Sequence, residues 1–88
     1  MLEKEFVIKN RLGLHARAAA QLVQTANRFK ADILVRKEDL EVNGKSIMGI
    51  LMLAAPKGST ITVAVRGDDA REAMDMVGRL IDDGFGED

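Results

Sequence analysis

The sequence predicts an α+β protein with two layers, an open-faced sandwich in which three helices cover one face of a four-stranded antiparallel sheet. Two kinds of pattern lead to this prediction. Four short segments are rich in β-branched or apolar residues, and in one of them, residues 60–66, Ile or Val alternates with Thr or Ala as in a strand. Two longer segments repeat apolar residues every three or four positions, which indicates helices. The order β-α-β-β-α-β-α is typical of the α+β class when the helices share one face of the sheet.

The first third of the chain predicts a strand, a loop and a helix. Residues 2–8 favour a strand because they end in Phe, Val and Ile, and residues 10–14 contain Gly13 and indicate a loop. A helix is expected from Ala16, fading between residues 27 and 30. Its predicted apolar face comprises Ala16, Ala19, Ala20, Val23 and Ala26.

The middle of the chain predicts a hairpin. Residues 32–37 carry a short apolar run, and residues 40–42 alternate with a period of two. The link between these two strands is short, so they are expected to pair antiparallel. Asn43 and Gly44 then end the second strand with residues that favour turns.

A short helix is expected after this hairpin. Ser46 stands where an N-cap belongs, ahead of the apolar residues 47–55. Residues 56–58, which read Pro-Lys-Gly, should close the helix.

The last third predicts the fourth strand and a long helix. Residues 60–66 form the strand, and Asp68 or Asp69 is expected to cap the helix that follows. We expect Gly84 to end this helix and residues 85–88 to be loose. The predicted buried stripe comprises Ala70, Ala73, Met74, Val77, Leu80 and Ile81.

Length and composition bound the function. A chain of 88 residues builds one modest core, so we expect a single domain over residues 1–88. Without cysteine and with one histidine, the chain offers neither disulfides nor a thiolate or polyhistidine metal site, and no cofactor is expected. No run of about 18 apolar residues could cross a membrane, and the first ten residues do not resemble a secretory signal. These features favour a cytoplasmic protein.

The charges are unevenly distributed along the chain. Residues 1–66 contain 11 basic and 6 acidic residues, whereas residues 67–88 contain 2 basic and 8 acidic residues. One interpretation is an acidic last helix with a solvated tail, and the other is a positive face that meets an acidic partner. Nucleic acid is disfavoured as a partner because aromatic residues make up only 3% of the chain, which leaves little for bases to stack on.

The single histidine, His15, is the strongest candidate for chemistry. It directly precedes the Ala-rich helix, whose N-terminus offers unpaired N–H groups and a positive dipole end. This environment disfavours a positively charged ring and can hold an anion attached to it. Arg17 adds a planar guanidinium suited to phosphate oxygens. Together these features indicate a phosphoryl acceptor.

Two motifs give the chain a family resemblance. Gly13-Leu14-His15-Ala16-Arg17 resembles the active-site motif of HPr, the histidine-containing phosphocarrier of the bacterial phosphotransferase system. The segment Gly44-Lys45-Ser46-Ile47-Met48-Gly49 fits a second motif of that family, and the resemblance covers essentially the whole chain.

The resemblance implies a function. It implies that enzyme I phosphorylates His15 on Nδ1, with phosphoenolpyruvate as the ultimate donor, and that Arg17 assists transfer to enzyme IIA components. It implies a cytoplasmic carrier, expected to be monomeric, and not an enzyme with turnover. The alternative is a regulatory or metabolite-binding α+β domain without covalent phosphoryl transfer.

The sequence departs from the family pattern at Ala18, where the family usually has Pro. Ala18 restores one backbone N–H at the start of the helix, and this donor could bind a phosphoryl group or water. Whether the chain serves sugar uptake or a regulatory or nitrogen-related branch stays open.

Ser46 has two interpretations. The structural one is a helix N-cap. The resemblance adds regulatory phosphorylation by HPr kinase/phosphorylase, which many bacteria possess, although enteric-type members carry the serine without that kinase.

The helix after Ser46 is apolar nearly all round and cannot bury every face in a two-layer sandwich. Exposed Met and aliphatic side chains suit a carrier that docks on several partners. The predicted docking surface comprises Ile47, Met48, Leu51 and Met52, with Lys45, Arg17 and Arg11 or Lys57 as its basic rim.

Overall fold

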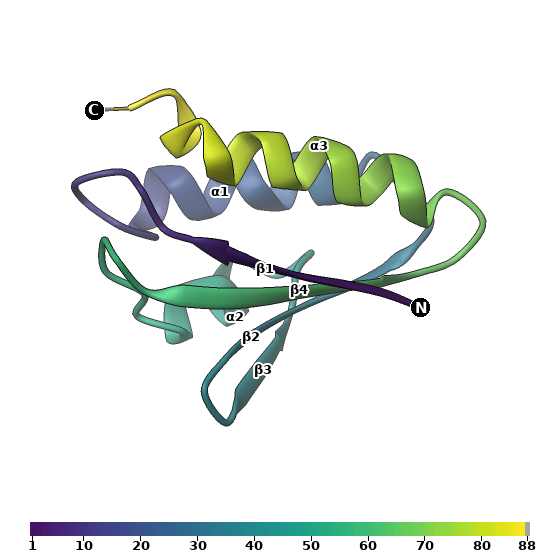
Figure 1. The fold of residues 1–88 in the computed structure, drawn as a ribbon, viewed down its shortest axis with the longest axis horizontal. Coiled ribbons are helices and arrows are strands. Elements are labelled where there is room, and N and C mark those ends of the chain that lie inside the picture. Colours follow the sequence, from purple (N-terminus) through teal and green to yellow (C-terminus); the bar gives the residue numbers. More distant parts are fainter. Residues whose placement is uncertain (88) are drawn as a thin grey trace.

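The computed structural model describes residues 1–87, and its elements follow the predicted order with one short addition at the end (Figure 1). The strands and helices are β1 (Leu2–Val7), α1 (Ala16–Ala26), β2 (Asp32–Lys37), β3 (Leu40–Asn43), α2 (Ile47–Met52), β4 (Thr60–Arg66), α3 (Ala70–Asp82) and a 3₁₀ turn, η1 (Gly84–Gly86). The predicted open-faced sandwich is confirmed.

The sheet has the order β1-β4-β2-β3, and all its strand pairs are antiparallel. β4 lies between β1 and β2, so Val65 faces Leu2 on one side and Ile33 on the other. β2 and β3 form the predicted hairpin, whose turn includes Glu38 at a φ of 55°. The helices α1 and α3 lie over the same side of this sheet (Figure 1).

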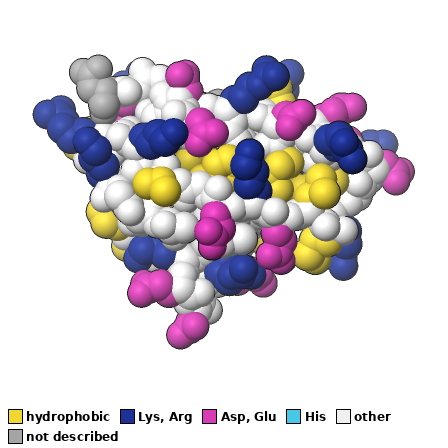
Figure 2. Space-filling view, in the orientation of Figure 1, with side chains coloured by type: hydrophobic (Ala, Val, Ile, Leu, Met, Phe, Trp, Pro, Cys, Tyr) yellow, Lys and Arg dark blue, Asp and Glu magenta, His cyan; other side chains and the backbone are white. Residues whose placement is uncertain are grey.

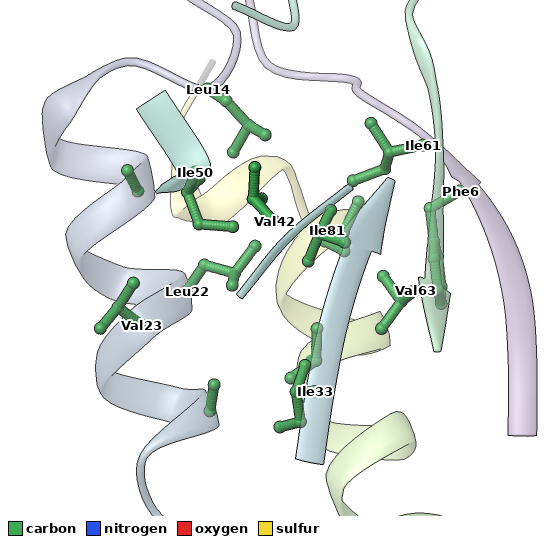
Figure 3. Close-up of a cluster of buried hydrophobic side chains, with 14 of the residues drawn as sticks. Phe6, Leu14, Leu22, Val23, Ile33, Val42, Ile50, Ile61, Val63 and Ile81 are labelled. Carbon is green, nitrogen blue, oxygen red and sulfur yellow. The ribbon is translucent and has the colours of Figure 1, made fainter. Parts of the chain in front are cut away.

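The core fills the space between the sheet and the helices (Figure 3). Alternation along β4 buries Ile61, Val63 and Val65, as a strand with one packed face requires. Every other helix and strand of the sandwich contributes side chains to the same core, among them Phe6, Leu22, Ile33, Val42, Ile50 and Ile81.

The buried face of α1 differs from the predicted one. Ala16 is exposed and Ala20 is half-buried, whereas the residues buried on this helix are Ala18, Ala19, Leu22, Val23 and Ala26. Leu22 explains the rotation because the largest apolar side chain of the helix gains most by facing the core. The predicted face contains four alanines and Val23 and leaves out Leu22.

The helix α2 ends three residues earlier than predicted. Ala54 has a φ of 49°, which is left-handed and ends the helix, and Ala55 precedes Pro56 and therefore disfavours helical backbone. Leu53 and Ala55 are nevertheless buried, so the segment after α2 still packs into the core.

The N-terminus of α3 also differs from the prediction. Asp69 occupies the N-cap position but its side chain makes no capping bond to α3. Its two carboxylate oxygens instead accept hydrogen bonds from the backbone N–H groups of Lys30 and Ala31, at 2.9 and 2.8 Å. The N–H of Lys30 above all lowers the pKa of Asp69, and the N–H of Ala31 and the charge of Lys45 act in the same direction against partial desolvation. Asp69 thus ties the start of α3 to the segment between α1 and β2.

The prediction of a loose segment after Gly84 was wrong for residues 85–87. The turn η1 places Phe85 in the core with 2% of its surface exposed, because its large apolar ring gains by burial. Glu87 follows and contacts His15. Asp88 lies outside the described residues.

Candidate functional site

His15 is the N-cap residue of α1. Its backbone is extended, with φ −79° and ψ −179°, and its carbonyl accepts the first helical bond from the N–H of Ala19 at 2.8 Å. Its ring nitrogen Nδ1 accepts a hydrogen bond from the N–H of Arg17 at 3.3 Å. The ring therefore folds back over the helix N-terminus, where the dipole and unpaired N–H groups favour negative charge.

The loop before His15 is held by the segment after α2. The N–H of Leu14 donates to the carbonyl of Ala55 at 2.9 Å. Gly13 has a φ of 70°, and a Cβ added there would lie 2.5 Å from the Ala55 oxygen. Only glycine meets both conditions, so Gly13 allows the loop to set His15 at the start of α1.

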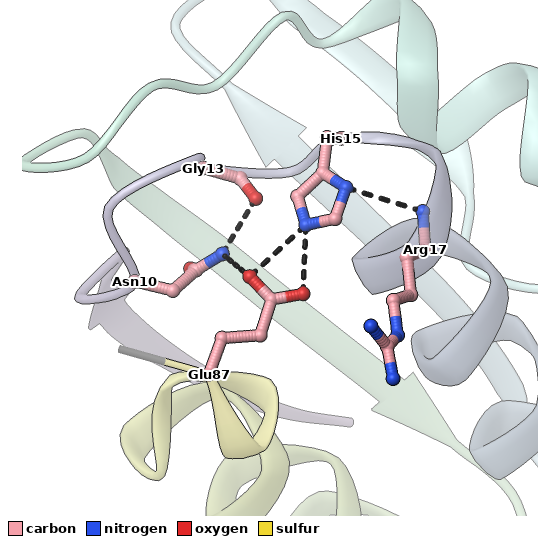
Figure 4. A network of polar contacts seen from close by, with 5 residues as sticks. All are labelled: Asn10, Gly13, His15, Arg17 and Glu87. Carbon is pink, nitrogen blue, oxygen red and sulfur yellow. Dashed lines mark hydrogen bonds and ion pairs between the residues drawn. The ribbon is translucent and has the colours of Figure 1, made fainter.

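A carboxylate lies on the other edge of the imidazole ring (Figure 4). The Glu87 oxygens are 2.7 and 3.0 Å from Nε2 of His15. Asn10 donates from Nδ2 to Glu87 Oε1 at 3.1 Å and to the Gly13 carbonyl at 2.7 Å. Since a carboxylate accepts at Nε2 and an N–H donates to Nδ1, these bonds assign the ring proton to Nε2 and leave the Nδ1 lone pair free of a proton.

Glu87 is charged in this environment. The hydrogen bond from Asn10 is the main factor that lowers the pKa of Glu87, and His15 and Arg17 add to it, against partial burial that raises the pKa. The side chain is only 16% exposed.

Sequence reasoning missed both Asn10 and Glu87. Glu87 is separated from His15 by 72 positions, and Asn10 was assigned to a loop without a role. The available signal was Phe85, because a large apolar residue among glycines indicates a segment that returns to the core.

Arg17 lies in the first turn of α1 and is exposed. Its side chain lines an open cleft together with His15 and Glu87. The rest of the lining is formed by Arg11, Leu12, Gln21, Phe85 and Gly86. Ala18 is buried, and its N–H precedes the first helical bond, so it is one of the free donors at the helix N-terminus. The cleft thus combines a nitrogen lone pair, backbone donors and a guanidinium, which can bond to a phosphorus atom and hold its oxygens.

Ser46 lies outside this cleft, on a different helix. Its Oγ accepts a hydrogen bond from the N–H of Gly49 at 3.1 Å, which confirms the predicted N-cap of α2. Its neighbour Lys45 donates from Nζ to the carbonyl of Phe29 at 2.7 Å. The Lys45 side chain is therefore bound to the segment between α1 and β2 and does not extend freely into solvent.

The predicted docking residues are exposed, as expected for a surface. The exposed fractions of Ile47, Met48, Leu51 and Met52 are 43, 74, 38 and 64%, whereas Ile50 and Leu53 are buried. Leu12, which the prediction omitted, is 62% exposed. A hollow lined by Leu12, His15 and residues 54–56 joins the histidine loop to the end of α2. Apolar surface therefore continues from α2 toward His15.

Two negative observations apply to residues 1–87. In this part of the chain no three His, Cys, Asp or Glu side chains gather in a way that could hold a metal ion. None of its helices has the length and apolar character needed to cross a membrane.

Comparison with known proteins gives a consistent result. The family model for the PTS HPr component phosphorylation site matches residues 2–83. The phosphocarrier protein HPr of Neisseria meningitidis serogroup A is 51% identical over 87 residues, which are 99% of this chain and 98% of the relative. The crystal structure of HPr-C-His from Thermoanaerobacter tengcongensis has a TM-score of 0.96 at 45% identity, and the match covers 100% of this chain and 99% of that one.

The fold and these matches define a phosphocarrier and not a catalyst with turnover. More particularly, the chain belongs to the HPr family of the phosphotransferase system, which confirms the resemblance drawn from its two motifs. A second Thermoanaerobacter tengcongensis structure, an HPr dimer, matches with a TM-score of 0.79 at 46% identity and covers 99% of this chain and 100% of that one. Dimers therefore occur among the relatives, and a monomeric state for this chain stays a prediction.

Proposed function

We propose that this chain is a cytoplasmic phosphoryl carrier that accepts a phosphoryl group from enzyme I on His15 and passes it to enzyme IIA components. The observation that carries the proposal is the orientation of the His15 ring, whose unprotonated Nδ1 lies over the N-terminus of α1. A nitrogen lone pair placed among N–H donors can attack phosphorus while those donors receive the oxygens.

The transfer step follows from this orientation. The Nδ1 lone pair forms a bond to phosphorus as the bond between phosphorus and the donor breaks, and the Nε2 proton stays in place. The ring thereby becomes positively charged and carries a phosphoryl dianion. The backbone N–H of Arg17 points to Nδ1, where the dianion forms, and the Arg17 guanidinium lines the same cleft. Both groups, with the helix N-terminus, can stabilise the dianion.

The test is phosphorylation of a variant. With enzyme I and phosphoenolpyruvate, the wild-type chain should gain an acid-labile, base-stable phosphate, and His15→Ala should gain none. The variant should still fold, because the buried core does not include His15. Uptake by His15→Ala at the wild-type rate would move the acceptor elsewhere, and no uptake by the wild type would favour a domain without covalent chemistry.

We also propose that the exposed side of α2 docks on these partners. The docking surface is formed by Ile47, Met48, Leu51 and Met52, and apolar surface connects it to His15. Met48→Asp should weaken binding to enzyme I at any salt concentration, since it places a charge in an apolar interface. Leu40→Asp, which alters an exposed apolar residue on β3 outside this surface, is the control and should bind as the wild type does. Equal affinities for Met48→Asp and Leu40→Asp would contradict this surface.

Phosphorylation of Ser46 by HPr kinase/phosphorylase is proposed as a regulatory input. Ser46 borders the docking surface, so a phosphate there adds about −1.5 to −2 charges at its edge. That charge should oppose binding of a partner whose acidic groups meet Arg17. Ser46→Asp should therefore raise the dissociation constant for enzyme I by a smaller factor than the phosphate does. Unchanged affinity of the phosphorylated protein would leave Ser46 as a helix cap.

A further inference from the structure

The contact between Glu87 and His15 joins the segment after α3 to the start of α1, and it also acts directly on the imidazole ring. We infer that Glu87 is a positioning residue for phosphoryl transfer, which keeps the ring proton on Nε2 and stabilises the positive charge of the ring once Nδ1 carries a phosphoryl group. This inference rests on the proposed function of His15.

The first support is the pair of contacts on opposite edges of the ring. Both oxygens of Glu87 lie within hydrogen-bond distance of Nε2, at 2.7 and 3.0 Å. At the other edge the N–H of Arg17 points to Nδ1 at 3.3 Å, a weaker contact that the backbone alone provides. The shorter, charge-assisted bond at Nε2 is therefore the one that decides where the proton resides.

The second support is that Glu87 is itself held in place. Asn10, which is 1% exposed, donates to Glu87 and to the carbonyl of Gly13, so one buried amide joins the carboxylate to the loop that carries His15. Two positions before Glu87, the ring of Phe85 is buried in the core. A carboxylate fixed from both sides has lost most of its freedom before it meets the imidazole, which strengthens the bond it can offer.

The third support is the balance of charge in the transfer step. When Nδ1 bonds to phosphorus, the neutral ring gains one positive charge, and Glu87 is the carboxylate that faces it. The charged side chains that line the cleft with His15 are Arg17 from α1, Arg11 from the preceding loop and Glu87 from the segment after α3. With Nε2 protonated, the ring leaves as neutral imidazole when the next acceptor takes the phosphoryl group. Without that proton it would leave as an imidazolate, which is a far poorer leaving group.

The test compares Glu87→Gln and Glu87→Ala with Glu72→Gln, which removes an exposed carboxylate from the first turn of α3. Nitrogen-15 chemical shifts of the His15 ring report the tautomer in the unphosphorylated protein. The wild type and Glu72→Gln should hold the proton on Nε2, and Glu87→Ala should populate both tautomers. This measurement needs no phosphoryl donor, so its outcome is independent of whether enzyme I acts on the chain.

A second measurement isolates the charge. Phosphoramidate, a small chemical donor, phosphorylates the histidine of each variant, and the phosphorus-31 signal is followed against pH. The midpoint at which the phosphorylated ring loses its Nε2 proton should move to lower pH in both Glu87 variants, because the carboxylate that faces the positive ring is gone. Onward transfer above that midpoint should slow, whereas Glu72→Gln should match the wild type. Tautomers and midpoints unchanged in both Glu87 variants would overturn the inference, and thermal melts confirm that each variant is folded.

Discussion

At the scale of single residues, the backbone and the side chain of Arg17 have separate roles in the site. Arg17 contributes twice, through its backbone N–H to Nδ1 of His15 and through a guanidinium that lines the cleft. The backbone contribution survives any substitution except proline. Variants at this position therefore change the side chain and leave the backbone contact with Nδ1 in place.

The expected result is a graded loss of transfer rate. Arg17→Lys keeps the charge but loses the planar pair of donors, so phosphorylation of His15 should slow modestly. Arg17→Glu should slow it by more than tenfold, since each factor of ten corresponds to about 1.4 kcal/mol of barrier. Rapid-quench measurements with phosphorylated enzyme I would show the order. Arg28→Glu, an exposed arginine beyond the end of α1, is the control, and a rate for Arg17→Glu equal to it would remove the side chain from the mechanism.

The residues that sequence reasoning found and missed differ in how their contacts arise. His15, Arg17 and Ser46 could be placed because a helix N-cap is a local feature, decided within about four positions. Asn10 and Glu87 could not, because their contacts form only when the segment after α3 packs against the loop before α1. The buried face of α1 was missed for a similar reason, since the sheet and not the helix decides which side is covered.

At the scale of elements, the position of α1 depends on a contact between two loops. The loop before α1 passes so close to the segment after α2 that no side chain fits at Gly13. This contact sets the histidine loop against the end of the helix that bears the proposed docking surface. His15 and the proposed docking surface therefore share one structural support.

Gly13→Ala should disturb this support. Left-handed backbone costs a non-glycine residue about 1–2 kcal/mol, and the Cβ would also meet backbone atoms 2.5 and 2.9 Å away. Gly58→Ala is the matched control, because Gly58 has a φ of 91° but nothing within 4 Å of the added Cβ. Denaturant unfolding should show a larger loss of stability for Gly13→Ala, together with slower phosphorylation. Equal losses for the two variants would show that the close approach carries no cost.

At the scale of the whole molecule, the uneven charge along the chain does not give a single sign of charge to the face seen in Figure 2. In the view of Figure 2, basic and acidic side chains are interspersed around a band of apolar atoms. Individual carboxylates instead act as ties between distant segments. Asp69 joins the start of α3 to the segment between α1 and β2, and Glu87 joins the segment after α3 to His15 at the start of α1.

These ties predict a loss of stability in acid. The pKa of Asp69 in the folded chain is lowered from its ordinary value of 3.8, chiefly by the N–H of Lys30, so the folded state binds a proton less readily than the unfolded chain. Its contribution is therefore fully present above the unfolded value and is lost as pH falls through the lower, folded value. Glu87, whose pKa is lowered from 4.5, acts in the same direction.

Thermal melts between pH 7 and pH 2 would measure the contribution of Asp69. Asp69→Asn should melt below the wild type at neutral pH, and the difference should shrink in acid as the wild-type carboxylate becomes protonated. Asp75→Asn, on an exposed position of α3, should follow the wild-type curve throughout. A constant difference between the wild type and Asp69→Asn at every pH would rule out the charge of Asp69 as its cause.

The bond between His15 and Glu87 also has a consequence for the order in which the protein is made. A ribosome delivers the loop, the histidine and α1 early, and it delivers Glu87 72 positions later. During translation, the nascent chain therefore presents the imidazole without its carboxylate, and its ring proton is free to exchange between the two nitrogens. The contact between His15 and Glu87 forms only when β4 has joined the sheet and the segment after α3 has docked. A chain that fails either step has His15 in place without its carboxylate partner.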